Sequence, residues 1–351
     1  AGRPFQQMQD AGMRTAHLDQ IVRQRDPGLK KTVEALAQGD TQDAVTRLIE
    51  HRRIHEIVDQ EQRLKAVAED YLKNPASSLV VSPDNPSRLA INRQIHLSLQ
   101  AQGKVNGAEH QVKILVNRHE LTGADRQWAA RYEPGDVIRY TQGSSRIGVK
   151  AGEYATVVQV RKEENRLSVR RENGKEITYD PKRLRGVNVY QQEERAFSRG
   201  DRVQFTAPFK DAKVANRELG VIEKIDSTGK LRLQMESGRT IDFNVREHPH
   251  LDYGYAMTSY TSQGQTVDRV IVHVPAKTQE NSDLVNQRFA YVALSRARLD
   301  AQVYTHDAST LRERLGRDVS KTAAMDGTEF RQVGHFAFKE GQKRVQEQAQ
   351  I

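Results

Sequence analysis

Two arginines at the end of an expected helix are the first groups in this sequence that could do chemistry. Residues 288–294 have helix-like apolar spacing, and the segment SRAR follows them directly. A guanidinium held at the end of an element can donate a fork of hydrogen bonds to a phosphate, and it acts most strongly on a phosphoryl group in transfer. Arg296 is therefore our candidate for phosphate chemistry. The alternative is that Arg296 and Arg298 only cap a surface helix.

A second polar group precedes the arginines in the chain. Residues 255–258 form a short apolar run, and residues 270–274 form a β-branched run of the buried-strand type. The polar turn between these expected strands offers neutral hydrogen bonds that can hold a sugar-phosphate without sequence preference. We expect both polar groups to gather at the strand ends where open α/β sheets bind ligands. The residues of the second group are Thr258, Ser262, Gln263 and Gly264.

Together, the stretches TSYTSQGQTVDRV and FAYVALSRAR resemble motifs V and VI of superfamily 1 helicases. Their sequences are most similar to the RecD-like helicase part of conjugative relaxases of the TrwC/TraI type, and the resemblance extends over most of the chain. It implies that Gln263 and Gly264 link nucleotide to DNA and that Arg296 is an arginine finger. It also implies ATP and Mg²⁺ as cofactors, and 5′ to 3′ unwinding of plasmid DNA during transfer.

A third stretch, LDQIVRQRDPGLKKTVEALAQGD, resembles the motif IV segment of the same family, where an Arg-Gln pair follows a short apolar strand. By that match, Arg23 would reach the γ-phosphate of ATP and Gln24 would support it. The alternative is that Arg23 is an ordinary solvated arginine in the run RQRD.

The composition bounds the class of protein. The chain has 351 residues, which is enough for two or three domains with a core in each. Its 55 Lys and Arg exceed its 46 Asp and Glu, and the net charge of +9 suits a polyanionic partner, although a modest excess spread over the surface is the plain alternative. The absence of cysteine excludes disulfides and thiolate metal sites. No apolar run reaches the roughly 20 residues that span a bilayer, and the start lacks an apolar signal region, so we expect a cytoplasmic protein without membrane insertion.

The first third of the chain predicts helices followed by one strand-helix unit of a parallel sheet. Pro27 suits a first helical turn, and Gly39 suits a helix end. Residues 78–81 then form a buried-strand pattern, and Pro86 begins a further helix. On that helix, Arg88 and Arg93 could contact DNA phosphates, with ordinary surface charge as the alternative. Further strands of the parallel sheet are expected near residues 112, 255, 271 and 302.

A repeat occupies the middle of the chain. GDVIRYTQGSSRIGVKAGEYATVVQV and GDRVQFTAPFKDAKVANRELGVIEKI begin at Gly135 and Gly200 and align 65 residues apart, and the segments that follow align 64 residues apart. Each copy contains short alternating strands and a hairpin turn, at Asn173-Gly174 in the first copy and Ser237-Gly238 in the second. Two tandem SH3-like β-barrels are therefore predicted.

The second copy also resembles the segment before motif V in RecD-like helicases, where a small barrel interrupts the second motor domain. The family usually has Asn-Gly-Glu where this chain has Asn216-Arg217-Glu218. Because an arginine resists the positive φ that a glycine would supply, the chain departs from the family at this turn.

These patterns predict an α/β fold in which a RecA-like parallel-sheet motor domain is interrupted by the two barrels, after a helical N-terminal segment. The expected parts are residues 1–75, a helical segment with the motif IV-like stretch; 76–132, the first part of the second motor domain; 133–190 and 196–248, the barrels; 250–318, the second part of that domain with motifs V and VI; and 319–351, a flexible tail.

A phosphate loop is missing from the pattern. The stretch GSSRIGVKA resembles one at first sight, but Gly148 is followed by Val149 rather than Lys, and the expected context is a barrel loop. We therefore expect the C-terminal motor half of an ATP-dependent DNA helicase that acts on single-stranded DNA. N-terminal helicase and relaxase parts of the same polypeptide would supply the phosphate loop and the Mg²⁺ ligands, and no metal site is predicted in this chain. The main alternative is a truncated, catalytically silent single-stranded DNA-binding module.

Overall fold

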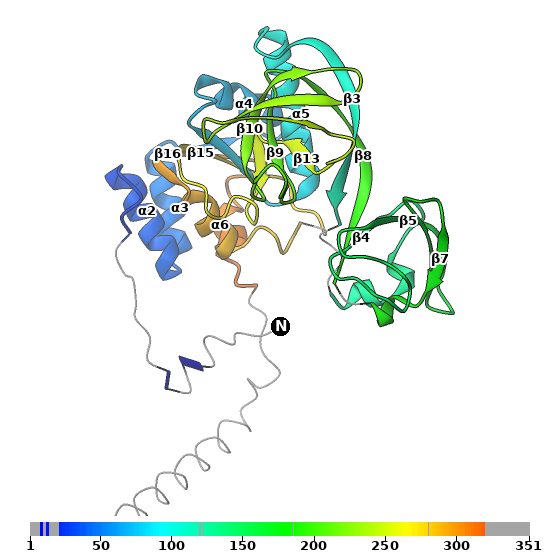
Figure 1. The fold of residues 1–351 in the computed structure, drawn as a ribbon. Helices are drawn as coiled ribbons and strands as arrows, with labels where there is room; N and C mark the ends of the chain where they lie inside the picture. The colour runs from blue at the N-terminus through cyan, green and yellow to red at the C-terminus, as the bar shows by residue number, and fades with distance from the viewer. Residues whose placement is uncertain are drawn as a thin grey trace, which may run out of the picture.

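The computed structural model describes residues 8, 9, 12, 13, 21–118, 121, 123–184, 186–279 and 281–319. The described chain forms one parallel and two antiparallel sheets (Figure 1). The predicted tail, apart from residue 319, lies outside the described residues. No helix within the described ranges is long and apolar enough to cross a membrane.

The parallel sheet has the strand order β1-β16-β15-β2-β14 and carries helices on both faces. Side chains of β2 alternate between two cores, so that Leu79 and Val81 face one layer and Val80 faces the other. The strands are β1 (Ile54–Glu56), β2 (Ser78–Ser82), β14 (Ala256–Thr258), β15 (Val267–Val274) and β16 (Ala297–Thr305). The helices α2 (Pro27–Gln38), α3 (Thr41–Glu50), α6 (Gln287–Leu294) and α7 (Leu311–Gly316) cover the first face, and α4 (Gln60–Lys73) and α5 (Asn85–Ala101) cover the second.

Local signals explain the bounds of the first helices. The Asp26 carboxylate accepts a hydrogen bond from the Leu29 N–H at the start of α2, and Gly39 ends that helix with a left-handed φ of 88°. These ends agree with the prediction. The stretch before α4 does not, because Ile54–Glu56 is not helical but pairs in parallel with β16. Three residues are too few to show a strand period in the sequence.

The strand expected near residue 112 is also placed differently. Residues Asn106–Asn117 (β3) pair antiparallel with Val187–Arg199 (β8), and so they do not join the parallel sheet. The alternation of polar and apolar residues in β3 is typical of a half-buried antiparallel strand, whereas strands of a covered parallel sheet are continuously apolar. The predicted part 76–132 therefore does not belong entirely to the parallel-sheet domain.

The two antiparallel sheets contain the two copies of the repeat. One sheet has the order β3-β8-β4-β5-β6-β7, and the other has the order β12-β11-β10-β9-β13. The remaining strands are β4 (Val137–Tyr140), β5 (Tyr154–Arg161), β6 (Arg166–Arg171), β7 (Glu176–Tyr179), β9 (Arg202–Phe205), β10 (Leu219–Ile225), β11 (Lys230–Met235), β12 (Thr240–Asn244) and β13 (Leu251–Tyr253).

Equivalent irregularities recur in both copies. A register shift follows Val157 in β5 and Ile222 in β10, and Gly174 and Gly238 turn the two hairpins with φ of 79° and 88°. The predicted antiparallel repeat and its hairpin turns are thus confirmed, whereas closure into SH3-like barrels stays a prediction.

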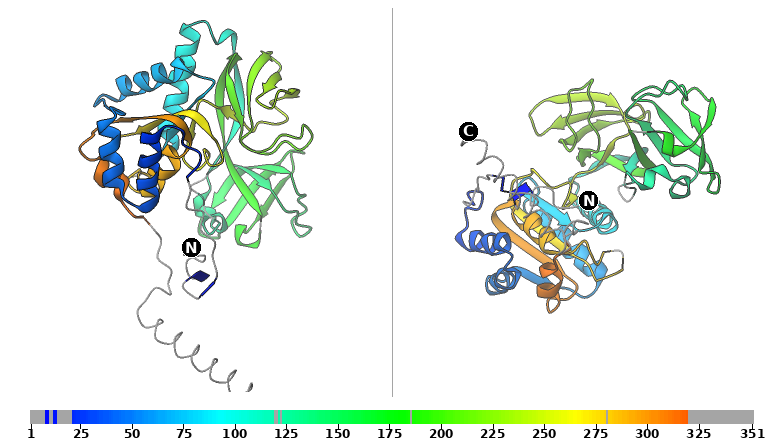
Figure 2. Two further views of the ribbon diagram at one scale, coloured as in Figure 1. Left: turned by 90° about the vertical axis from the view of Figure 1, so that its left-hand side faces the viewer. Right: turned by 90° about the horizontal axis from the view of Figure 1, so that it is seen from below.

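The two copies pack differently against the rest of the chain. The second sheet shares its core with α4 and α5, since Phe205 and Ile222 belong to the same buried cluster as Tyr71 and Ile95. The first copy has a buried cluster of its own around Tyr140. Figures 1 and 2 show the strands β4, β5 and β7 standing apart from the parallel sheet.

The edge strand β14 is held by one buried side chain of α5. The Asn92 amide donates to the Ala256 carbonyl oxygen at 3.2 Å, and its oxygen accepts from the Ala256 N–H at 2.8 Å. These bonds satisfy the backbone groups that point away from β2 at this position. Asn92 therefore fixes the strand that leads into the motif V stretch.

We expect Asn92→Ala to destabilise the chain by about 2 to 3 kcal/mol, because two buried backbone groups lose their partners. Urea unfolding followed by circular dichroism measures this change. The neighbouring Arg93 is exposed, so Arg93→Ala should stay within about 0.5 kcal/mol of the unmodified chain. Equal stability of the two variants would show that Asn92 does not hold β14.

Candidate functional site

Three of the predicted site residues meet where α6 ends and β16 begins. The Arg23 guanidinium donates to the Ser295 carbonyl oxygen at 2.7 Å. The Gln24 side-chain N–H donates to the carbonyl oxygens of Ser295 and Ala297, at 3.1 and 2.8 Å. Arg296 lies between these two carbonyl groups in the chain. The motif IV-like and motif VI-like stretches are therefore in direct contact, whereas their roles stay predictions.

Arg296 is half-buried and folded back on its own helix. Its Nε donates to the Val292 carbonyl oxygen at 2.9 Å, and its Nη2 donates to the Ser295 hydroxyl at 3.0 Å. Burial, and then the positive charge of Arg23, lower the pKa of the Arg296 guanidinium. The conformation is the one expected for a residue that caps a helix end.

The positive charge at this junction is not neutralised within the described chain. Among the described residues, no carboxylate lies within ion-pair distance of Arg23 or Arg296, whereas Arg298 pairs with Asp268 at 2.5 Å. The side-chain oxygen of Gln24 is also buried without a hydrogen-bond partner among those residues. Two adjacent unneutralised guanidinium groups favour an anion, because an anion would relieve their mutual repulsion.

The loop after β14 holds the motif V-like residues in two environments. Thr258 and Thr261 join hydroxyl to hydroxyl at 3.1 Å, and Ser262 is fully buried with its hydroxyl donating to the Ser259 carbonyl oxygen at 2.9 Å. Ser262 therefore shapes the loop and does not face solvent, which differs from its predicted DNA contact. Gln263 and Gly264 are exposed.

Gly264 has a φ of 92°, which favours glycine at this position. Apart from Gly264 and its two chain neighbours, no atom of the described residues lies within 4 Å of where its Cβ would be, so the backbone is open on that side.

The predicted polar residues do not gather at one edge of the sheet. Thr258 stands at the carboxyl end of β14, but the Arg296 carbonyl oxygen accepts from the Val267 N–H at the amino end of β15, at 3.1 Å. The junction of α6 with β16 lies at the amino edge because it precedes that strand. The loop 259–266 thus runs from one edge of the sheet to the other and connects the two polar groups.

The two arginines of α5 have different surroundings. Arg88 is mostly buried and pairs with the buried carboxylate of Asp252 at 3.0 Å, and Arg195 pairs with the same carboxylate at 3.1 Å. Arg88 is therefore engaged in a structural ion pair rather than presented to a DNA phosphate. Arg93 is exposed and remains a candidate for the predicted DNA contact.

A buried polar cluster that the sequence analysis missed links α5 to β14 and to the second antiparallel sheet. The His96 ring bonds the Asp201 carboxylate at 2.7 Å, and the Tyr255 hydroxyl donates to the same carboxylate at 2.6 Å. Burial would lower the pKa of His96, but the hydrogen bond and charge of Asp201, with a smaller contribution from Glu109, raise it overall. Polar residues at 92 and 96, inside the buried stripe of an amphipathic helix, were the signal for this cluster.

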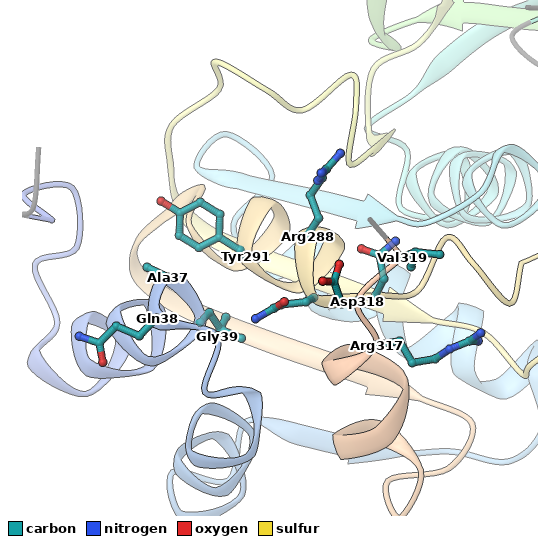
Figure 3. A pocket seen from close by; sticks show the side chains of 11 residues that line it. Ala37, Gln38, Gly39, Arg288, Tyr291, Arg317, Asp318 and Val319 are labelled. Carbon is teal, nitrogen blue, oxygen red and sulfur yellow. The ribbon is translucent and has the colours of Figure 1, made fainter. Parts of the chain in front are cut away.

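A pocket of about 530 Å³ lies along α6 on the side of α2 (Figure 3). Helix α6 contributes Arg288 and Tyr291, and the segment after α7 contributes Arg317. None of the predicted site residues lines this pocket.

The described chain has a mixed α/β fold with a parallel sheet, as predicted.

A family model described as an AAA domain matches residues 1–59. The multifunctional conjugation protein TraI of Escherichia coli is 20% identical over 269 residues, which cover 75% of this chain and 15% of TraI. The conjugal transfer protein TraA of Rhizobium radiobacter is 29% identical over 164 residues, which cover 44% of this chain and 14% of TraA.

The chain is therefore a homologue of the TraI and TraA conjugation proteins, which confirms the resemblance to relaxase-helicases of the TrwC/TraI type. It spans about 15% of the length of TraI. Among solved structures, the Pif1 helicase of Candida albicans is 15% identical, covers 85% of this chain and 58% of that chain, and has a TM-score of 0.38, which is too low to establish a common fold.

The His96 cluster predicts a pH-dependent stability. Because the folded-state pKa of His96 is raised above its ordinary value of 6.5, the protonated ring stabilises the fold fully below that pH, and this contribution is lost as the pH rises through the folded-state pKa. The stability difference between the unmodified chain and His96→Gln should therefore shrink from about pH 6 to about pH 9. Denaturant titrations at both pH values measure it.

Asn92→Ala provides the control, since it removes two buried hydrogen bonds from the same helix without changing a titratable group. The stability change caused by Asn92→Ala should differ much less between the two pH values. A pH-independent effect of His96→Gln would contradict a charged His96.

Proposed function

We propose that this chain is the C-terminal motor half of an ATP-dependent DNA helicase that acts on single-stranded DNA in conjugative plasmid transfer. One observation carries the proposal: Arg23 and Arg296, from opposite ends of the chain, meet as neighbouring guanidinium groups without a described carboxylate partner. A phosphate chain is the anion that such a pair fits best. The homology to TraI and TraA supports the assignment.

ATP would supply the γ-phosphoryl group, and the residues of the α6-β16 junction would meet its negative charge. Arg296 would act as the arginine finger, with Arg23 beside it. Gln24 would stabilise the junction through its hydrogen bonds to the Ser295 and Ala297 carbonyl groups. Within the described residues, no group of three His, Asp or Glu is placed to hold a metal ion. The Mg²⁺ ligands and the phosphate loop would come from the N-terminal helicase part of the polypeptide.

A phosphate would meet the N–H groups of Arg296 that are not already used. Of the five N–H groups of its guanidinium, one donates to the Val292 carbonyl oxygen and one to the Ser295 hydroxyl. The Arg296 carbonyl group is bonded to Val267 at the end of the motif V loop, so a shift of the junction would be transmitted along that loop. Thr258, Gln263 and Gly264 would carry it to single-stranded DNA at the opposite edge.

The second candidate is a catalytically silent single-stranded DNA-binding module. The present conformation of Arg296 favours it, since the side chain caps α6 through two hydrogen bonds within the protein and without a nucleotide. The two candidates differ in what Arg296 does during turnover.

In the longer polypeptide that carries a phosphate loop, Arg296→Ala should lower the DNA-stimulated ATPase rate by on the order of 10³-fold or more, because the finger acts only in the transition state. The melting temperature should change little, since two hydrogen bonds at a helix end contribute about 1 kcal/mol or less. Arg312, which is exposed on α7, is the matched control, and Arg312→Ala should keep normal turnover. Near-normal ATPase activity of a well-folded Arg296→Ala variant would support the silent module instead.

Binding of single-stranded DNA by this chain should be sequence-tolerant and should weaken as salt rises, because the proposed contacts are to phosphates. Titration of labelled oligonucleotides at two salt concentrations measures this dependence. Arg93→Ala should reduce the steepness of the salt dependence. An affinity that is independent of salt, or confined to one base sequence, would contradict these contacts.

A further inference from the structure

Tyr260 is the most exposed aromatic side chain of the described residues, with 63% of its surface accessible. It lies in the motif V loop, two residues after Thr258 and three before Gln263. A large exposed ring needs an explanation, because burial of an aromatic side chain is normally favourable. Its position at the carboxyl edge of β14 places it beside the proposed DNA contacts.

Among the described residues, one cation contacts the Tyr260 ring, and it comes from the loop between β9 and β10 of the second antiparallel sheet. The guanidinium of Arg217 lies over the ring, 5.0 Å from its centroid. No described residue accepts a hydrogen bond or an ion pair from that guanidinium. Arg217 is therefore held near the ring by stacking alone and keeps its N–H groups available.

Arg217 occupies a strained backbone position. Its φ is 73°, in the left-handed region that disfavours residues with a side chain, and Lys213 in the same loop has a φ of 53°. The equivalent positions of the first copy are Gly152 and Gly148, with φ of 87° and 72°. At these two turn positions, the first copy of the repeat has glycine and the second copy has a basic residue.

The two loops make equivalent backbone hydrogen bonds, so Arg217 and Gly152 occupy equivalent positions. The Arg217 N–H donates to the Phe205 carbonyl oxygen at 2.8 Å, and the Gly152 N–H donates to the Tyr140 carbonyl oxygen at 2.7 Å. Since glycine fits this turn without strain, the arginine costs stability that its backbone role does not require. The side chain of Arg217 must account for its presence.

The Arg217 loop is fastened to the strand that precedes Tyr260. The buried Gln204 amide donates to the Arg217 carbonyl oxygen at 3.3 Å and contacts the Met257 sulfur at 3.5 Å. This link holds the backbone of the Arg217 loop beside β14, the strand that leads to Tyr260. A rigid aromatic ring with an adjoining guanidinium plane is the arrangement on which unpaired bases stack.

From these observations we propose that Tyr260 and Arg217 form a stacking platform for an unpaired base of single-stranded nucleic acid. The base stacks on the exposed Tyr260 ring, and the Arg217 N–H groups are available to the adjoining phosphate. The platform rests on the proposed function and adds to it a contact with the base itself, which the phosphate-directed residues do not provide. It also gives the second antiparallel sheet a direct part in holding DNA.

The test compares two labelled single strands of equal length, an oligothymidylate and one whose nucleotides are abasic, so that phosphates are matched and only bases differ. Tyr260→Ala should weaken binding of the oligothymidylate by about tenfold or more. It should leave binding of the abasic strand unchanged. Tyr260→Phe should restore binding of the oligothymidylate, because stacking needs the ring and not the hydroxyl.

The variant Arg217→Gly distinguishes a loss of base stacking from a loss of stability. This variant takes the residue of the equivalent turn in the first copy, so it should be at least as stable as the unmodified chain, yet it should bind the oligothymidylate more weakly. Tyr291→Ala is the matched control, because Tyr291 is an exposed tyrosine on α6, in the separate pocket of Figure 3. It should bind both strands normally.

The outcomes distinguish the platform from the proposed function. If Tyr260→Ala has no effect on either strand, or weakens both equally, while the unmodified chain binds in a salt-dependent manner, the platform is wrong and the proposed DNA contacts stand. If the unmodified chain binds neither strand, the platform and the DNA contacts of the proposed function are both wrong.

Discussion

The junction between α6 and β16 depends on hydrogen-bond donors from the other end of the chain. A helix end leaves carbonyl oxygens without partners, and here the side chains of Arg23 and Gln24 satisfy those of Ser295 and Ala297. The Arg25 N–H adds a backbone bond to the Arg298 carbonyl oxygen at 2.7 Å. The segment before α2 is thus part of the parallel-sheet domain, and the position of Arg296 follows from this constraint.

Other arginines near this part of the sheet form ion pairs with aspartates. Arg53 pairs with Asp26 and Asp300, at 2.9 and 3.5 Å. Arg269 pairs with Asp300 and with the buried Asp70, each at 2.9 Å. This series of ion pairs ties β1, β16, β15 and α4 together. The unneutralised pair of Arg23 and Arg296 contrasts with this series. Arg53, Arg269 and Arg298 have carboxylate partners, whereas Arg23 and Arg296 have none among the described residues.

The two copies of the repeat use one equivalent aspartate to attach to different surroundings. In each copy the carboxylate accepts from a backbone N–H three residues earlier, from Glu133 to Asp136 at 2.9 Å and from Ser198 to Asp201 at 2.7 Å. Asp136 then binds Arg118 at 2.8 Å, whereas Asp201 binds His96 and Tyr255 of the parallel-sheet domain. The second copy thereby shares the core of the parallel-sheet domain, and the first copy keeps a core of its own.

Local physical signals determined much of this protein from sequence alone. Helix caps at Asp26 and Gly39, continuous apolar runs in β2 and β15, and glycine turns at 174 and 238 each act within a few residues, so the sequence is sufficient to predict them. The motif-bearing stretches were recognised for the same reason. Homology to the conjugation proteins agrees with that recognition.

Tertiary structure alone decided where those signals act. The three residues of β1 become a strand only because β16 is beside them, and β3 leaves the parallel sheet because β8 offers it an antiparallel partner. The burial of Ser262 and the ion pair of Arg88 with Asp252 likewise reflect neighbours that sequence spacing does not specify. The meeting of Arg23 with the Ser295 carbonyl group joins residues separated by 272 positions, a contact that depends on the whole path of the chain between them.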